Sequence, residues 1–296
     1  TSDMVLIISL HILLLLLLSI LVIVIYNIIL NNMVEVVHTN VEIENLPEEF
    51  QDFKILQLTD LHNKIFMNDQ KYLIDKINSI DYDILVITGD MSDYNDIEKS
   101  DGFIKLLDGI NNKNNIFYVD GNVGLIAIDD TTNKVTEIGE QLINKGCILL
   151  DKPYVIERNG QKLVLSQFLN KETYEKQYPE TKDEDIKIII THYPRDRRYY
   201  EEVSVGNLPD YDLVIAGHYH GGQYRIPFLG AIFIPNTNPY GTRFFPKQEE
   251  VSGLTEWGGY KQYISRGLGA SGDYKILRFR LFNIPQIDVL ILKNKE

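Results

Sequence analysis

The pattern of apolar and polar positions divides the chain into two unequal parts. Residues 4–30 read MVLIISLHILLLLLLSILVIVIYNIIL and contain no Asp, Glu, Lys or Arg. A helix needs about 20 apolar residues to cross a bilayer, whereas the apolar core of a signal peptide takes only about 7–15. The run therefore predicts a retained transmembrane anchor over residues 1–30, with a buried core helix as the alternative. No Lys or Arg precedes Lys54, so the charge pattern does not predict the orientation in the membrane.

Beyond the anchor, short apolar runs alternate with segments of helical spacing. Residues 31–52 are polar and acidic, and we expect a connector there that supplies a first edge strand, followed by one domain over residues 53–296. Strands are predicted at residues 53–58, 83–88, 116–119, 147–150, 153–157, 162–168, 186–191 and 212–216, and helices near 69–80, 96–110 and 133–146. Residues 231–292 look β-rich. Continuous apolar strands that alternate with helices are typical of a layered α/β fold.

Composition and charge exclude several classes of protein. Hydrophobic residues make up 44% of the chain and charged residues 24%, which is an ordinary globular balance. The net charge of −13 would repel nucleic acid phosphates, so a nucleic acid partner is not expected. Cys147 is the sole cysteine, which excludes an intramolecular disulfide and a cysteine-rich zinc module.

Five of the predicted strands end in residue types that bind metals. In chain order these residues are Asp60 and His62, then Asp90, then Asn122, then His192, and finally His218 and His220. Every histidine after the connector belongs to this set. The carboxyl ends of strands in an open α/β sheet form the ligand crevice, and residues two apart on an extended backbone point the same way. The pattern therefore predicts a metal site.

The ordered motifs resemble those of the calcineurin-like metallophosphoesterases over about residues 53–292. The shared order is Asp-x-His, Gly-Asp, Gly-Asn, His and Gly-His-x-His. The apolar anchor, the segment GHYHGGQYRIP and the later SRGLG resemble a membrane-associated phosphodiesterase branch that includes some UDP-2,3-diacylglucosamine hydrolases. The resemblance implies a four-layer α/β/β/α fold in a single-pass protein of the cell membrane, and it favours the extracytoplasmic side for the domain.

The resemblance also implies two divalent metal ions and the residues that hold them. Asp90 would bridge the ions, with one ion held by Asp60, His62 and His220 and the other by Asn122, His192 and His218. Asn122 and His192 are in addition candidate catalytic residues. Oxygen and imidazole ligands suit Mn, Fe or Zn. Two cations roughly 3.5–4 Å apart activate water and hold phosphoryl oxygens, so no protein nucleophile is required.

One position departs from the family pattern. The usual Gly-Asn-His-[Asp/Glu] appears here as Gly121-Asn122-Val123-Gly124. In the family the missing histidine protonates the leaving group or stabilises the transition state, and valine can do neither. We therefore expect a membrane-anchored phosphoesterase that acts on a phosphodiester or pyrophosphate bond of a lipid-linked or nucleotide-sugar substrate. The alternative is a catalytically weakened relative that binds metal and ligand.

Two further groups of residues have two interpretations each. Aromatic side chains crowd the segment after the last candidate ligand, namely Tyr224, Phe228, Phe233, Tyr240, Phe244, Phe245, Trp257, Tyr260 and Tyr263. They are either the core of a β-rich lobe or an apolar lip that faces the bilayer. Arg195, Arg197 and Arg198 follow His192, and they either bind substrate phosphate or lie on a solvated helix face.

Overall fold

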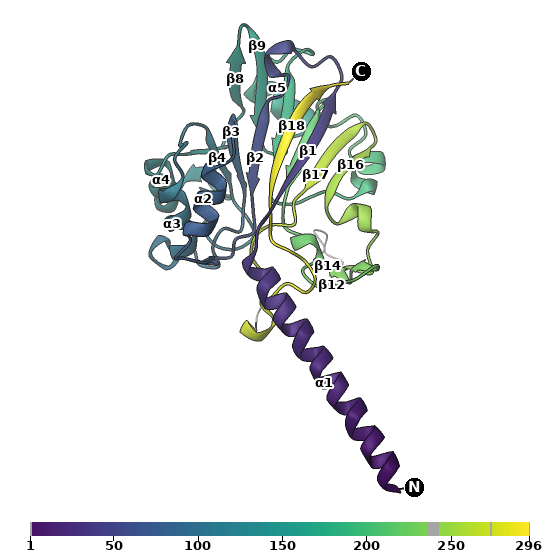
Figure 1. Cartoon of the computed structure of the whole chain (residues 1–296). Helices are drawn as coiled ribbons and strands as arrows, with labels where there is room; N and C mark the ends of the chain where they lie inside the picture. The colour runs from purple at the N-terminus through teal and green to yellow at the C-terminus, as the bar shows by residue number, and fades with distance from the viewer. Residues whose placement is uncertain (1, 236–242, 273, 296) are drawn as a thin grey trace.

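The apolar run forms one continuous helix in the computed structural model, which describes residues 2–235, 243–272 and 274–295. This helix, α1 (Ser2–Asn32), projects away from the rest of the protein (Figure 1). The most apolar stretch of α1 has no buried residue, so the alternative of a core helix is wrong. By length and composition α1 could cross a membrane.

The last turns of α1 are attached to the domain by two asparagines spaced four residues apart on one helix face. Asn31 donates from Nδ2 to the backbone oxygen of Arg280 at 2.7 Å, and its Oδ1 accepts from the Arg280 N–H at 2.8 Å. The Oδ1 of Asn27 accepts from the N–H of Phe282 at 2.6 Å. Lys64 adds a bond from Nζ to the backbone oxygen of Asn31. These contacts fix the base of α1 against the domain.

Two six-stranded sheets form the centre of the domain. The first has the order β1 (Glu35–Ile43), β18 (Gln286–Asn294), β2 (Lys54–Leu58), β3 (Ile84–Thr88), β4 (Ile116–Val119) and β7 (Cys147–Leu149). The second has the order β16 (Gly253–Trp257), β17 (Tyr260–Ile264), β11 (Leu213–Ala216), β10 (Ile186–Ile190), β9 (Gln161–Ser166) and β8 (Tyr154–Arg158). The connector thus supplies an edge strand, β1, as expected.

Alternate residues of the central strands face two different cores, which explains their continuous apolar sequences. On β2, Ile55 packs between the two sheets, whereas Leu56 faces the helices. Those helices, α2 (Lys71–Asn78), α3 (Asp101–Gly109) and α4 (Glu137–Asn144), cover the outer face of the first sheet (Figure 1). A third core packs α5 (Lys171–Gln177) and the π-helical turn Tyr199–Val203 on the second sheet. The result is the predicted four-layer α/β/β/α arrangement.

Several elements differ from the sequence-based expectation. The helix expected near 96–110 begins at Asp101, because Asp96 caps a separate 3-10 turn at Ile97–Lys99. The helix expected near 133–146 begins at Glu137, where Thr136 accepts a capping bond from the Gly139 N–H. The residues before it form the hairpin β5 (Ile128–Asp129) and β6 (Lys134–Val135). α5 was not predicted, since Tyr174 is its one buried side chain.

The aromatic segment divides between the two interpretations. Tyr263 is buried between the sheets, and Trp257 and Tyr260 pack on the third core. Phe228, Phe244 and Phe245 are exposed. The exposed ones belong to the short hairpins β12 (Arg225–Ile226) with β13 (Gly230–Ala231) and β14 (Phe233–Ile234) with β15 (Arg243–Phe244), or directly follow them. Tyr240 lies outside the described residues.

We expect a chain without residues 1–26 to be soluble and folded, because the strands and both asparagine contacts are retained. Within this shortened chain, Asn31→Ala removes two hydrogen bonds to Arg280 and should lower the free energy of unfolding by about 1–3 kcal/mol. The matched control is Asn32→Ala, since Asn32 bonds within the helix to Ile28. Urea unfolding followed by circular dichroism measures both. Insoluble protein would contradict the expectation that the domain folds without residues 1–26, and equal stability of the two variants would contradict the expected role of Asn31.

Candidate metal centre

Six of the seven predicted ligands form two clusters of acceptor atoms at the ends of central strands. Within each cluster the candidate ligand atoms lie within 4.8 Å of one another, and all six residues are buried. One cluster holds Asp60, His62 and His220, and the other holds Asp90, His192 and His218. The seventh residue, Asn122, joins the second cluster through its contact with His192. The structure therefore brings together every residue that the sequence pattern selects.

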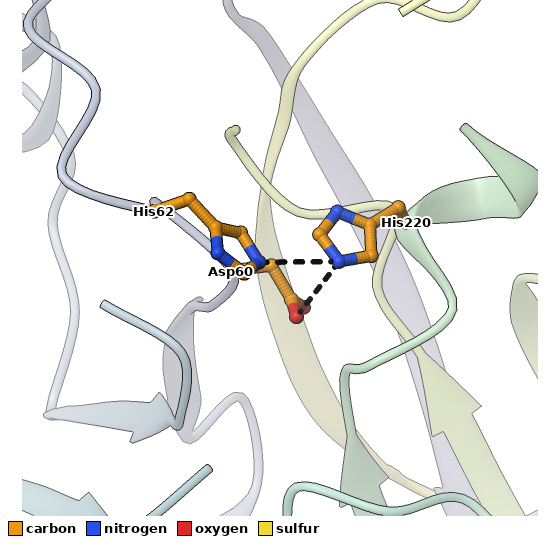
Figure 2. Close-up of side chains that lie close together, drawn as sticks. All are labelled: Asp60, His62 and His220. Carbon is orange, nitrogen blue, oxygen red and sulfur yellow. Dashed lines mark hydrogen bonds and ion pairs between the residues drawn. The ribbon is translucent and has the colours of Figure 1, made fainter. Parts of the chain in front are cut away.

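The first cluster contains a buried carboxylate oxygen that no described residue satisfies. Oδ2 of Asp60 accepts from the Thr59 hydroxyl at 2.8 Å and from the His218 N–H at 3.0 Å, while Oδ1 is buried without a hydrogen-bond partner among the described residues. The Nε2 atom of His220 lies 3.5 Å from this oxygen and 3.3 Å from Nε2 of His62 (Figure 2). Buried acceptors without partners are costly, and a cation among these three atoms would satisfy them. The residues therefore fit a metal ion.

The second cluster is oriented by the backbone. Nδ1 of His192 bonds the Thr88 carbonyl at 2.8 Å, which turns its Nε2 toward the centre. That nitrogen lies 2.9 Å from Oδ1 of Asn122, 3.1 Å from Nδ1 of His218 and 3.4 Å from Oδ2 of Asp90. A backbone oxygen on the far nitrogen is a common way to fix a metal-binding imidazole. This cluster is likewise suited to a cation.

Asp90 lies between the two clusters. Its Oδ2 is 3.4 Å from Nε2 of His192 in one cluster and 3.7 Å from Nε2 of His62 in the other. Its Oδ1 accepts from the Val123 N–H at 3.0 Å, which fixes the plane of the carboxylate. One side chain is thus within reach of both cation positions.

The backbone at the centre is strained in a consistent way. Five candidate ligands have φ between 49° and 72°, namely Asp60, His62, Asp90, His218 and His220. Residues other than glycine seldom adopt this left-handed region, and such strain persists where the surrounding structure enforces it, often at functional sites. The sharp turns after each strand direct these side chains back over the strand ends.

The family pattern described as calcineurin-like phosphoesterase matches residues 53–222. The chain belongs to this family. Membership agrees with the two candidate metal clusters and supports a metal-dependent phosphoesterase reaction.

Individual relatives support the same family assignment. The chain is 30% identical over 270 residues to the uncharacterized metallophosphoesterase Cj0846 of Campylobacter jejuni, a match that covers 88% of this chain and 64% of that protein. It is 27% identical over 279 residues to the uncharacterized metallophosphoesterase YkuE of Bacillus subtilis, covering 89% and 87%. A shorter match of 26% over 106 residues relates 36% of the chain to 32% of the phosphodiesterase YaeI of Escherichia coli. The narrower resemblance to UDP-2,3-diacylglucosamine hydrolases stays a prediction.

Burial and neighbouring charges shift the pKa values of several candidate ligands toward the forms that bind metal. Burial, reinforced by His192, lowers the pKa of His218 to about 4, and burial together with His62 holds the pKa of His220 well below its ordinary value. Burial alone would raise the pKa of Asp90, but the bond and charge of His192 lower it below the usual range. Neutral His218 and His220 and an ionised Asp90 are the forms that bind metal, whereas the contact with Asp90 raises the pKa of His192 against the effect of burial.

Sequence reasoning missed the residues that support the ligands from outside. Oδ1 of Asp93 bonds Nδ1 of His62 at 2.7 Å, and Nη1 of Arg278 pairs with Oδ2 of Asp93 at 2.6 Å. The buried guanidinium of Arg280 donates to the backbone oxygens of His220 and Gly269. Asp93 lies three residues after the candidate ligand Asp90 in the sequence, and this closeness is only a weak signal of a supporting role. Nothing in the sequence connects the two arginines with the histidines that they support.

Five of the seven candidate ligands line a cavity of about 500 Å³, the catalytic cavity, and Val123 lines it beside Asp90 and Asn122. Tyr219 also lines this cavity, whereas Tyr193 packs its ring 4.9 Å from the ring of His218. Val123 thus occupies the wall where the family places its acid histidine.

The arginines after His192 have other partners. Arg197 and Arg198 form exposed ion pairs with Glu201 and Glu202, and Arg195 stacks on the ring of Phe168. The exposed ion pairs favour the solvated-face interpretation for Arg197 and Arg198, whereas Arg195 is half-buried against the rings of Phe168 and Tyr199 and does not lie on a solvated face.

The close approach of Gly121 to Asp90 provides a test of the centre. An added Cβ at Gly121 would overlap Oδ1 and the backbone nitrogen of Asp90. Gly121→Ala should therefore displace Asp90 and lower the metal content of the purified protein by at least one equivalent, as measured by plasma mass spectrometry. Gly160→Ala is the control for backbone strain alone, because the left-handed φ of 82° disfavours a side chain there while nothing lies within 4 Å of its added Cβ. Unchanged metal content in Gly121→Ala would show that metal binding does not depend on the present position of Asp90.

Proposed function

We propose that the chain is a membrane-anchored phosphoesterase with two metal ions, which hydrolyses a phosphodiester or pyrophosphate bond of a lipid-linked or nucleotide-sugar substrate. The observation that carries this proposal is the position of Asp90, whose Oδ2 lies 3.4 Å from His192 in one ligand cluster and 3.7 Å from His62 in the other. Such a carboxylate can serve two ions at once.

The proposed ligand sets follow from the distances within each cluster. Asp60, His62 and His220 would hold one ion. Asn122, His192 and His218 would hold the other, with Asp90 shared between them. Carboxylate, amide and imidazole donors favour Mn, Fe or Zn over soft-ligand metals. When bound, a pair of such cations supplies an activated water and stabilises the charge of the in-line displacement.

The residues of this chain then have defined tasks in the reaction. Water adds to phosphorus, the bond to the leaving oxygen breaks, and that oxygen needs a proton unless it is already a weak base. The Asp93 carboxylate holds the ring of His62, and the Thr88 carbonyl holds that of His192. Val123 cannot donate a proton. We therefore expect good leaving groups, such as aryl oxides or phosphates, to react faster than alkoxides.

The alternative function is a weakened relative that binds metal and ligand without efficient turnover. Val123 is the observation that favours it, since the cavity wall carries an apolar side chain where the family has its acid. Metal-dependent hydrolysis of bis-p-nitrophenyl phosphate distinguishes the two functions. Turnover that chelation abolishes and Mn²⁺ restores supports the enzyme.

The membrane is part of the proposal. The apolar helix α1 would span the bilayer once and hold the domain at its surface. The resemblance to membrane-associated phosphodiesterases favours the extracytoplasmic side for the domain. A phosphorylated lipid or small molecule is the proposed partner.

Removal of the shared carboxylate should abolish binding of both ions. Asp90→Ala is expected to lose two metal equivalents, whereas His62→Ala should lose mainly one, because His62 belongs to a single cluster. Asp75→Ala is the control, since Asp75 pairs with Lys71 on the exposed surface of α2. Metal analysis of the purified variants measures the difference. If Asp90→Ala retained the parent's metal content, the proposed ligand sets would be wrong.

A histidine at position 123 should restore the missing acid. General acid catalysis contributes about 10²–10⁴-fold, and the contribution is larger for basic leaving groups. Val123→His should therefore raise kcat/KM for an alkyl phosphodiester by about 10²-fold or more, with a much smaller gain for a p-nitrophenyl ester. The Val123 backbone is held by its bond to Asp90, so the new side chain would face the same cavity.

Val123→Ala is the control for altered bulk without a proton donor, and all variants are compared at matched metal content. Equal gains on both ester types, or no gain on either, would mean that the valine is not the catalytic deficit. Tyr193 or Tyr219 would then be the next candidates for the proton donor.

A further inference from the structure

A second cavity, of about 610 Å³, lies between the base of α1 and the domain. Val24 and Ile28 of α1 line one side, and Phe279 and Leu281 of the domain line the other. His62 lines both this cavity and the catalytic cavity, and so does Arg278. The two cavities are therefore neighbours with a shared wall at the metal centre.

The second cavity has a mainly apolar lining and a basic side chain beside the metal centre. Its apolar lining comes from α1, which also contributes Asn27, Asn31 and Asn32, and from the segment that the asparagines attach to α1. Arg278 lines the cavity next to the metal centre, since its partner Asp93 bonds His62. Lys64 lines it with its Nζ bonded to the Asn31 carbonyl, and burial lowers the pKa of Lys64 to about 7. Water gains little in an apolar cavity, whereas a hydrocarbon chain is stabilised there. A complementary occupant has an apolar chain that ends in an anionic group.

Exposed apolar side chains surround the same end of the domain. Tyr274, Ile276 and Leu277 lie on or beside a short 3-10 turn, Lys275–Leu277, and all three are exposed. The hairpins that carry Phe228 and Phe244 lie at the end of the domain from which α1 emerges (Figure 1). Large exposed apolar groups at the base of a membrane-spanning helix are typical of contact with a bilayer. A lipid chain could thus enter the cavity directly from the membrane.

We propose that this cavity holds the hydrocarbon chain of a membrane lipid phosphoester, whose phosphate group extends past Arg278 into the catalytic cavity. The inference rests on the proposed function and selects the lipid-linked substrate over the nucleotide sugar. In this arrangement α1 contributes to substrate binding as well as to anchoring. Arg278 keeps its pair with Asp93 and presents its charge at the boundary of the two cavities.

The test compares two esters with the same leaving group, methyl p-nitrophenyl phosphate and octyl p-nitrophenyl phosphate. The full-length protein is kept in dodecyl maltoside, which contains no phosphoester. We expect kcat/KM for the octyl ester to exceed that for the methyl ester by about tenfold or more, because several methylenes become buried. Val24→Trp fills the cavity and should abolish this preference by lowering kcat/KM for the octyl ester to about that for the methyl ester.

The matched control is Val22→Trp. Two residues along a helix turn by about 200°, so Val22 faces away from the cavity that Val24 lines. The control should keep the preference for the octyl ester. A preference that survives Val24→Trp would come from partition into the micelle and would overturn the inference, as would equal rates on the two esters in the parent.

Photolabelling separates failure of the inference from failure of the proposed function. An octyl phosphodiester with a diazirine at the chain end should label the α1 segment 23–28, and Val24→Trp should prevent this. Labelling without metal-dependent hydrolysis would keep the lipid cavity and overturn the proposed activity. Hydrolysis without labelling of α1 would keep the proposed activity and overturn the lipid cavity. Absence of both hydrolysis and labelling would overturn the proposed activity and the lipid cavity.

Discussion

The structure depends on burying several carboxylate and imidazole acceptors where two sheets meet. Asp60 and Asp90 come from the first sheet, and His192, His218 and His220 come from the second. Acceptors at this density repel one another in a low-dielectric interior unless positive charge lies between them. The left-handed turns after the strands and the tight contact between Gly89 and Gly121 bring the ligands this close. A side chain at Gly89 would meet both Gly121 of the same sheet and His192 of the other sheet, and a side chain at Gly121 would meet Asp90.

This constraint determines how much the sequence could predict. Strands buried on both faces have continuous apolar sequences, and parallel neighbours place their carboxyl ends together, so the ligand types after each strand were readable in chain order. The helical layer over the first sheet followed from the spacing of apolar residues in α2, α3 and α4. The same reasoning found the long apolar helix α1, because core helices of soluble domains rarely run this long without a charged residue.

The remaining features depend on contacts that only the folded chain creates. Asp93 reaches His62 through a loop, and Arg278 arrives from a segment far along the chain. α5 has too few buried side chains to show a periodic pattern. The left-handed conformation of His62 and Asp90 has no sequence signal either, since it is enforced by the surrounding packing rather than by a glycine.

The helix α1 is more closely connected to the metal centre than an apolar run followed by a polar connector would imply. Asn31 bonds the backbone of Arg280, and the side chain of Arg280 supports the backbone of His220. Burial lowers the pKa of Arg280 to about 9, yet backbone oxygens of four residues accept its hydrogen bonds and hold it in place. A short series of polar contacts therefore extends from the helix to a candidate ligand.

The position of β18 has a consequence for the order of events during synthesis. β18 inserts between β1, with which it runs parallel over nine paired residues, and β2, with which it runs antiparallel. Both neighbours are near the start of the chain, whereas β18 comprises residues 286–294. While translation proceeds, α1 leaves the ribosome long before the first sheet can close, and β1 and β2 expose open edges until β18 emerges. An emerging chain of this kind needs those edges shielded throughout elongation, which is a task for chaperones.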